Sequence, residues 1–394
     1  MSSRCVAFVV SGHDNYGVRR GTIGLMAELR ARGHAPFAIA LEMGDAAREI
    51  MELGFDVNEV GLGKPPTLAG SPAAKIGRAF SLRRFTREAR PRIGASLRER
   101  GAEAVHVRWP NLVPVAAAAA HTEGLPTLWH MPNIVSDNLP FGLNRRLWRR
   151  LCLTKRVVPL ANSRYTASTL DGGGIRCEVL YVPIAAERFD PERVEPVTRS
   201  EVGLPEDAVV AGVLSRVTPS KGQDRLVEAV GLGGGALARV HLAVIGGPGS
   251  PGDEAYVARI RRRIDELGLH DRVHLLGFVP DPERYYGLLD FSINARVDPE
   301  PFGLSVTESM AMGVPVLAHA LGGPAETVVD GKTGWHVSDP SPGSFATGLE
   351  RALNDRERWG LMGEAARRRA VEQFTMGPLT DRYESILEAS LTGA

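Results

Sequence analysis

Short runs of apolar residues recur along the first half of the chain, with stretches of helical spacing between them. The apolar runs lie at residues 5–10, 37–41, 57–60, 104–108, 126–131, 157–161 and 178–182. Runs of this length are typical of strands that are buried on both faces of a sheet. Apolar residues at helical spacing, such as Ile23, Met26 and Leu29, predict helices between the strands. Because alternating strands and helices form parallel sheets with right-handed crossovers, this half predicts an α/β domain.

The second half repeats the same alternation after a break. The segment from Pro183 to Pro205 is rich in Pro, Glu and Arg and has no clear periodicity. Strands are then predicted at 209–214, 240–245, 273–276, 291–294, 315–318 and 334–337, with helices at 224–230 and 255–267 and a helical tail over 344–387. A chain of 394 residues is long enough for two domains of roughly 150–200 residues. We therefore expect domains at 1–183 and 201–377, joined by a linker at 184–200.

Composition and charge exclude several classes of protein. The hydrophobic share of 43% and the charged share of 24% are ordinary for a globular protein, and a net charge of +1 gives no general attraction to nucleic acid. Three scattered cysteines are too few for a disulfide framework or a zinc site. No apolar run approaches the ~18–20 residues of a membrane span. The sequence therefore predicts a cytoplasmic protein.

The region from Lys64 to Arg100 differs from the rest because basic residues dominate it. It contains Lys75, Arg78, Arg83, Arg84, Arg87, Arg90, Arg92, Arg98 and Arg100, with Ile76, Phe80, Leu82 and Phe85 among them. A basic amphipathic helix of this kind can contact anionic lipid or an anionic acceptor, at the inner face of a membrane for example. The alternative is a solvated helix face in an arginine-rich chain. The pattern leaves both interpretations open.

The segment Asp298–Val316 carries the strongest chemical signal. Glu300 precedes a Pro-Phe-Gly turn, and Glu308 follows eight residues later on a predicted helix over 307–312 that Gly313 and Pro315 end. Backbone N–H groups around Gly303, Leu304 and Ser305 would be free at the helix N-terminus, where anions bind. Two carboxylates beside such N–H groups suit a ligand that carries both hydroxyls and phosphates.

Two cations follow the strand at 209–214. Arg216 and Lys221 lie just past its carboxyl end, the edge at which open α/β sheets bind ligands. A guanidinium and an ammonium can clamp a diphosphate without metal; the alternative is a turn with two solvated cations. In the first half, the loop 11–17 follows the first strand, but Gly12 and Gly17 do not form G-x-G-x-x-G, so the usual dinucleotide fingerprint is absent.

Four motifs together resemble the retaining glycosyltransferases of family 4 (glycosyl transferases group 1), which have the GT-B fold. Glu300 and Glu308 match the E-x7-E motif, and Ala311–Val316 matches its Ala-x-Gly-x-Pro-Val sequel. Gly322–Gly334 resembles the family's Gly-Gly-x-x-Glu tail, and Ser215–Gly222 resembles its Arg…Lys-Gly phosphate motif. The resemblance implies two facing Rossmann-like domains with an interdomain cleft, a hinge in the linker, and a last helix, about 378–394, that packs back on the first domain.

The resemblance also implies roles for individual residues. Glu300 would bind the donor sugar, Glu308 the ribose hydroxyls, and Arg216 with Lys221 the diphosphate. The donor site would further include Phe302, Gly303, Leu304 and Ser305, with Phe278 and Val279 beside the nucleobase. In the first domain Gly17 would let the backbone approach the phosphates, and His130 would touch the donor sugar. His106 and Asn133 are weaker candidates, and loop position alone suggests Asp14, Arg19 and Arg108 for the acceptor side.

These residues predict a retaining, metal-independent glycosyltransferase without a cofactor. It would move a sugar from a UDP- or GDP-sugar to an acceptor such as a cell-envelope polysaccharide, glycolipid or natural-product precursor. The absence of Asp-x-Asp agrees with metal independence. Neither glutamate is expected to act as a nucleophile, because the family is thought to use attack on the same face as the leaving phosphate. The alternatives are a nucleotide-sugar epimerase of the same fold, or a non-catalytic nucleotide-sugar-binding protein.

Overall fold

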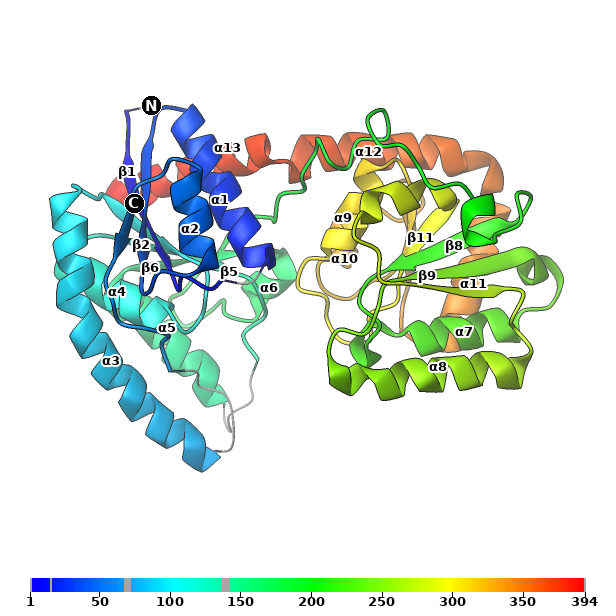
Figure 1. The fold of residues 1–394 in the computed structure, drawn as a ribbon, viewed down its shortest axis with the longest axis horizontal. Helices are drawn as coiled ribbons and strands as arrows, with labels where there is room; N and C mark the ends of the chain where they lie inside the picture. The colour runs from blue at the N-terminus through cyan, green and yellow to red at the C-terminus, as the bar shows by residue number, and fades with distance from the viewer. Residues whose placement is uncertain (1, 15, 67–71, 137–141, 393–394) are drawn as a thin grey trace. The chain divides into compact units, whose positions relative to one another are not determined.

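The computed structural model describes residues 2–14, 16–66, 72–136 and 142–392, and its contacts divide the chain into two compact units. One unit comprises Met1–Val182 with Met376–Ala394, and the other comprises Pro183–Thr375. Both are α/β units built on a parallel sheet (Figure 1). The prediction of a GT-B fold, with two Rossmann-like domains, is confirmed.

The first unit holds a seven-stranded sheet in the order β3-β2-β1-β4-β5-β6-β7. Its elements are β1 (Cys5–Val10), α1 (Tyr16–Ala31), β2 (Ala35–Ala40), α2 (Asp45–Glu52), β3 (Val57–Glu59), α3 (Pro72–Glu99), β4 (Ala104–Val107), α4 (Val113–Thr122), β5 (Thr127–Met131), α5 (Leu143–Lys155), β6 (Val157–Ala161), α6 (Arg164–Ser168), β7 (Glu178–Val179) and the last helix, α13 (Met376–Thr392). Buried side chains of α3, α4 and α5 pack on one face of the sheet, and those of α1, α2 and α13 pack on the other.

The second unit holds a six-stranded sheet in the order β10-β9-β8-β11-β12-β13. Its elements are β8 (Val209–Leu214), α7 (Gln223–Leu232), β9 (Val240–Ile245), α8 (Glu254–Leu267), β10 (Val273–Gly277), β11 (Phe291–Asn294), α9 (Leu304–Ala311), β12 (Val316–His319), α10 (Pro324–Thr327), β13 (Gly334–Val337), α11 (Pro342–Asn354) and α12 (Trp359–Phe374). Short 3-10 helices lie at Ser200–Val202, Pro219–Lys221, Gly235–Arg239, Pro251–Asp253, Pro282–Leu288 and Arg356–Arg358. The neighbouring strands described in both sheets pair in parallel, as the alternation of strands and helices predicts.

The structure differs from the sequence prediction at four places. The basic region forms one helix of 28 residues, α3, with Pro91 inside it. The helical tail divides into α11, α12 and α13, and α9 begins at Leu304, three residues before the predicted start. The stretch predicted as a linker belongs to the second unit: Phe189 is buried there, and the Val197 N–H donates to the carbonyl oxygen of Arg284 at 3.0 Å.

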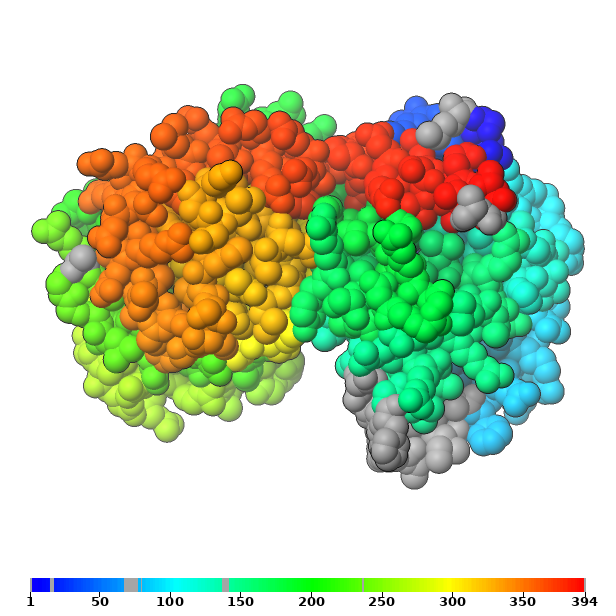
Figure 2. All heavy atoms as spheres, turned by 180° about the vertical axis from the view of Figure 1, so that it is seen from behind, coloured from blue at the N-terminus to red at the C-terminus, as the bar shows by residue number. Residues whose placement is uncertain are grey.

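Helix α13 belongs to the first unit although it ends the chain. Its Leu379, Tyr383 and Leu387 are buried among the residues of β1, β2 and α1. The other side of the helix is exposed, as the red surface in Figure 2 shows. Across the residues that the structure describes, no helix is both long enough and apolar enough to cross a membrane.

Candidate functional site

The predicted donor residues of the second unit gather at one point of its sheet. Strands β8 and β11 are neighbours, although the helices α7 and α8 and the strands β9 and β10 separate them in the sequence. Between these two strands the order of the sheet reverses, which is where doubly wound folds bind ligands. The loop after β8 carries Arg216 and Lys221, and the loop after β11 carries Glu300. Parallel pairing therefore brings the two motifs to the same sheet edge.

A cluster of three charged side chains forms at this edge. The Lys221 Nζ lies 2.7 Å from Oε2 of Glu300, and Nη1 of Arg296 lies 3.1 Å from the same oxygen. The Glu300 side chain is only 10% exposed. Arg296 also pairs with Asp298, whose carboxylate lies 2.8 Å from its Nε. One partly buried carboxylate thus holds two cations in fixed positions.

Arg296 was missed at the sequence level, although a signal exists. It lies just past the carboxyl end of β11 and four residues before Glu300. Burial lowers the pKa of Arg296, but the hydrogen bond to Asp298 and the charge of Glu300 outweigh burial and raise the pKa above its usual value. The guanidinium is therefore a permanent cation. An arginine and a carboxylate in one loop at this edge predict such a pair.

Two glycines fix the backbone around Glu300. Gly322 has φ +86°, and a Cβ on it would stand 2.1 Å from the carbonyl oxygen of Glu300. The next N–H, of Gly323, donates to that carbonyl at 2.7 Å, and a Cβ on Gly323 would stand 2.2 Å from the carbonyl oxygen of Phe302. The Gly-Gly of the sequence motif therefore allows the segment before α10 to lie directly against the Glu300 turn.

The loop that carries Lys221 is tied to the loop after β11 in the same way. Gly222 has φ +70°, and a Cβ there would stand 2.3 Å from the carbonyl oxygen of Ala295. The Val297 N–H donates to the carbonyl oxygen of Ser220 at 3.0 Å. These close approaches explain why glycine follows Lys221, and they hold the ammonium at the distance that the ion pair with Glu300 needs.

Helix α9 begins beside this cluster. Gly303 is its N-cap with φ +92°, and the helix starts at Leu304 and Ser305, as the anion-cradle prediction requires. Leu304 is 39% exposed, whereas Phe302 is 3% exposed and its ring packs against Phe374 at 5.8 Å between centroids. The ring of Phe302 is therefore a packing element of the second unit, and a role for this residue in donor binding stays a prediction.

Glu308 lies further along α9 and is half-buried. Beside it is Tyr286, whose hydroxyl donates to the carbonyl oxygen of Ser305 at 3.2 Å. Burial raises the pKa of Tyr286 well above its usual value, and the charge of Glu308 and a hydrogen bond to it raise the pKa further. Tyr286 was not found from the sequence, since nothing in its 3-10 helix distinguishes it from a core tyrosine. Tyr286 thus restrains Glu308, the fifth residue of the helix.

Arg216 lies apart from the Glu300 cluster. It is exposed, and a Cβ built on Gly249 would stand 3.2 Å from its Cδ, so its side chain extends along the loop after β9. Phe278, at the end of β10, is 81% exposed, and a Cβ on Gly247 would stand 3.2 Å from its Cβ. Val279 beside it is half-buried. An exposed aromatic ring at a strand end is consistent with the predicted contact to a nucleobase, which stays a prediction.

The candidates of the first unit lie deeper than the sequence suggested. His130 is 1% exposed inside β5, and its ring packs edge-on against His106 at 6.0 Å between centroids. Burial, then the charge of Arg108, lowers the pKa of both histidines well below the usual value, so both are neutral. His130 is therefore a core residue of β5, and the contact with the donor sugar that the resemblance implies for it stays a prediction.

The remaining candidates divide between core and edge. Arg108 and Asp14 are buried together at the ends of β4 and β1, and burial raises the pKa of Asp14. Burial lowers the pKa of Arg108 to about 10, although the negative charge of Asp14 acts to raise it. Arg19 pairs with Glu49 of α2 at 2.9 Å, and Gly17 is the second residue of α1. Asn133 is exposed just after β5.

Comparison with known proteins finds a family that the second unit resembles. Residues 194–369 match the family model described as glycosyl transferases group 1, and the four sequence motifs lie within that range. The chain is 31% identical over 224 residues to the GDP-mannose-dependent alpha-(1-6)-phosphatidylinositol monomannoside mannosyltransferase of Mycolicibacterium smegmatis. The aligned residues make up 54% of this chain and 57% of that protein. A mannosyltransferase of the same name from Mycobacterium tuberculosis is 29% identical over 70% of this chain and 71% of its own length.

The chain spans about half the length of the first curated relatives that it matches, 57% and 49%. Among solved structures, a glycosyltransferase from Rickettsia africae superposes with a TM-score of 0.81 at 20% identity, over 100% of both chains. The Anabaena protein HepE in complex with UDP and glucose superposes with a TM-score of 0.73 at 20% identity, over 98% of this chain and 99% of that one. At this identity the likeness concerns the fold.

Proposed function

We propose that this protein is a retaining, metal-independent glycosyltransferase that moves a sugar from a nucleoside diphosphate sugar to an acceptor. The observation that carries the proposal is the Lys221–Glu300–Arg296 cluster at the sheet reversal, beside the N-terminus of α9. Fixed cations and free N–H groups suit a diphosphate, and a carboxylate between them suits sugar hydroxyls. The described residues contain no group of three or more His, Cys, Asp and Glu side chains placed to hold a metal.

The proposed chemistry follows from where charge develops. The acceptor oxygen forms a bond to the anomeric carbon, the bond from that carbon to the diphosphate oxygen breaks, and the acceptor proton passes to the leaving phosphate. Attack on the face that the phosphate leaves retains the configuration. Negative charge builds on the diphosphate, so Lys221, Arg216 and the N–H groups at Leu304 and Ser305 lower the barrier, each by about 3–4 kcal/mol at most.

The carboxylates have the complementary task. Glu300 accepts hydrogen bonds from the donor sugar and supports the positive charge at its anomeric carbon, whereas Glu308, oriented by Tyr286, accepts them from the ribose. When the diphosphate binds, it competes for Lys221 and Arg296, which releases carboxylate oxygens of Glu300 to the sugar. The ion pairs of the free protein thus keep the site arranged until the donor arrives.

We propose UDP or GDP as the nucleotide and a glycolipid or envelope polysaccharide precursor as the acceptor. Support comes from similar proteins: HepE forms a complex with UDP and glucose, the mycobacterial relatives are GDP-mannose-dependent, and a Salmonella typhimurium relative is a lipopolysaccharide 1,2-N-acetylglucosaminetransferase. The first unit is the proposed acceptor side, and Asp14, Arg19 and Arg108 are its candidate residues.

A panel of UDP-, GDP-, ADP- and dTDP-sugars tests the proposal. A donor at ~100 times its dissociation constant should add about 2.7 kcal/mol of stability, which a thermal shift detects. Release of the nucleoside diphosphate with acceptor present should fall strongly in Lys221→Ala and Glu300→Ala and stay unchanged in Lys332→Ala, an exposed lysine of the same unit. Interconversion of nucleotide sugars without release would indicate an epimerase instead. Binding without turnover in any variant would indicate a non-catalytic protein.

A further inference from the structure

Positive charge is concentrated on one helical layer of the first unit. Helix α3 contains eight basic and two acidic residues, and α5 contains five basic residues and no acidic one. Helix α4, which contacts both, contains neither Lys, Arg, Asp nor Glu. The layer therefore has a formal charge of +11, although the whole chain has only +1. Such asymmetry indicates an anionic partner on this side of the unit.

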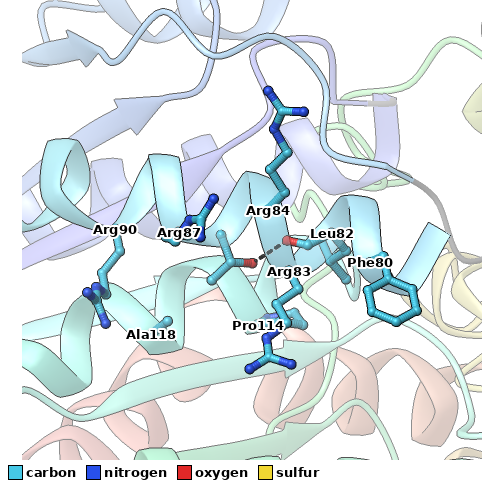
Figure 3. Close-up of a pocket in the computed structure, with 9 residues that line it drawn as sticks. Phe80, Leu82, Arg83, Arg84, Arg87, Arg90, Pro114 and Ala118 are labelled. Carbon is cyan, nitrogen blue, oxygen red and sulfur yellow. Dashed lines mark hydrogen bonds between the residues drawn. The ribbon is translucent and has the colours of Figure 1, made fainter. Parts of the chain in front are cut away.

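The outer side of α3 forms a groove with α4 in which apolar and basic groups alternate. The groove has a volume of about 780 Å³. Phe80, Arg83, Arg87 and Arg90 are spaced by three, four and three residues, so they form one stripe along the helix. Figure 3 shows Phe80, Arg83 and Arg90 on the side of α3 that faces Pro114 and Ala118 of α4. The stripe therefore begins with an apolar ring and continues with three cationic side chains.

The side chains of this stripe are exposed and free to meet a partner. Phe80 is 70% exposed, and Arg83, Arg87 and Arg90 are exposed as well. Arg84 pairs with Glu88 at 3.2 Å on the surface of α3. For Arg83, Arg87 and Arg90, the part of the chain that the structure describes offers no carboxylate within ion-pair distance.

Helix α5 adds a second exposed surface of the same character. Leu143, Leu147 and Leu153 are 47%, 53% and 55% exposed, and Arg146 and Arg150 are exposed between them. A solvated basic helix needs no exposed leucines, because polar residues in their place would be better hydrated. Leucines and arginines on one exposed helix face are typical of a helix that lies in the interface of a bilayer.

We infer that the outer side of the α3–α4–α5 layer docks on the surface of an anionic lipid bilayer. Arg83, Arg87, Arg90 and Arg150 bind lipid phosphates, and Phe80, Leu143 and Leu147 enter the boundary between headgroups and acyl chains. Each basic side chain near an anionic surface strengthens binding by about fivefold, and buried apolar area adds to this. Docking of this layer goes beyond sugar transfer and does not depend on it.

Sedimentation of the full chain with vesicles tests this inference. We expect binding to phosphatidylcholine vesicles that contain phosphatidylglycerol, weak binding to phosphatidylcholine alone, and loss of binding with added salt. Because three charges act together, Arg83→Glu/Arg87→Glu/Arg90→Glu should weaken binding at least about a hundredfold. The matched control is Arg261→Glu/Arg262→Glu/Arg368→Glu, three exposed arginines of the second unit, which should bind like the wild type.

The apolar contribution distinguishes a bilayer from other polyanions. Phe80→Ser should weaken binding to anionic vesicles several-fold, whereas Leu361→Ser should not, although Phe80 and Leu361 are 70% and 69% exposed. Absence of binding to anionic vesicles, or equal losses in the two arginine triples, would overturn the inference. The inference would also be overturned if the protein bound an RNA duplex as tightly as anionic vesicles and Phe80→Ser weakened neither interaction. Circular dichroism verifies that each variant is folded.

Discussion

Lys221 and Glu300 lie 79 residues apart in the sequence, and their side chains form an ion pair of 2.7 Å. The pair joins the loops that follow two neighbouring strands, β8 and β11, at the reversal of the sheet order. Arg296 holds the same carboxylate from its other side at 3.1 Å. Because the proposed transfer needs the lysine on the phosphate and the glutamate on the sugar, this pair connects the two parts of the donor.

The first prediction is that Lys221 and Glu300 act as a unit. Lys221→Ala and Glu300→Gln should each lower turnover about 100- to 1000-fold, as loss of one preorganised group does. The double variant should be hardly worse than the poorer single variant, because residues that act together are not additive. Single-turnover kinetics on the four proteins measures the coupling. Strictly multiplicative losses would show that the two side chains act independently.

The second prediction concerns Gly322. Its φ of +86° and the 2.1 Å approach of a Cβ to the carbonyl oxygen of Glu300 make Gly322→Ala strained and displace the Glu300 turn. The left-handed conformation alone costs about 1–2 kcal/mol, and a shift of about 1 Å at a reacting group can lower turnover ~100-fold. Thermal unfolding and turnover should therefore both fall. Gly343→Ala is the control: it lies in the first turn of α11 with open space around it, so stability should stay equal or rise.

Much of the donor half was accessible from the sequence because it depends on local spacing. Glu300, Gly303 and Glu308 lie within nine residues of one another, and the turn and helix that separate them follow from Pro, Gly and helix-forming residues. The strands of both sheets were predicted, since continuous apolar runs mark parallel strands. The position of Lys221 at the same sheet edge as Glu300 could also be predicted, because parallel strands end at one edge of a sheet.

The sequence could not give the features that depend on what packs over a residue. His130 looked like an edge residue in the sequence, but it is buried beside His106, and the ring of His106 contacts Tyr383 of α13. No local sequence pattern contains these contacts. The bounds of α3 could not be set from the sequence, because Pro ordinarily interrupts a helix, whereas Pro91 lies inside α3 with its side chain exposed. Tyr286 and Glu308 meet only in three dimensions.

The third prediction uses the buried histidines as pH probes. Burial lowers the pKa of His106 well below its usual value, so the folded protein keeps it neutral while the unfolded chain protonates it below about pH 6.5. The unfolded state then binds more protons, and the free energy of unfolding falls as pH decreases, by up to about 1.4 kcal/mol per pH unit for one histidine. Stability should thus be full above pH 6.5 and decline below it.

Comparison with a variant isolates the contribution of His106. His106→Phe keeps a ring beside Phe8 and Tyr383, which contact His106 at 4.7 and 5.5 Å between centroids. Between pH 6.5 and 5 the slope of unfolding free energy against pH should be smaller in this variant by about 1.4 kcal/mol per unit. His121→Asn, at an exposed histidine, should leave the slope unchanged. Identical slopes in wild type and His106→Phe would mean that His106 protonates in the folded protein.

The last prediction concerns the attachment of α13 to the first unit. Glu384 of α13 is 10% exposed at its side chain, and it lies 2.9 Å from Nε2 of buried His34 and 3.0 Å from Nη1 of Arg32. Asp381, one turn earlier, pairs with the same arginine but is 70% exposed. Because removal of a buried partner leaves the other groups uncompensated, Glu384→Ala should destabilise the first unit by about 3–5 kcal/mol.

Asp381→Ala provides the matched comparison, since it removes an exposed carboxylate from the same cation and should cost at most about 1 kcal/mol. Hydrogen exchange of the β1 and β2 amides reports the unfolding of this unit separately from the other. In Glu384→Ala the exchange should accelerate at least about a hundredfold, because those strands lie under α13 in the core that Tyr383 and Leu387 complete. Equal acceleration in both variants would show that burial of Glu384 does not hold the helix, and that its apolar face does.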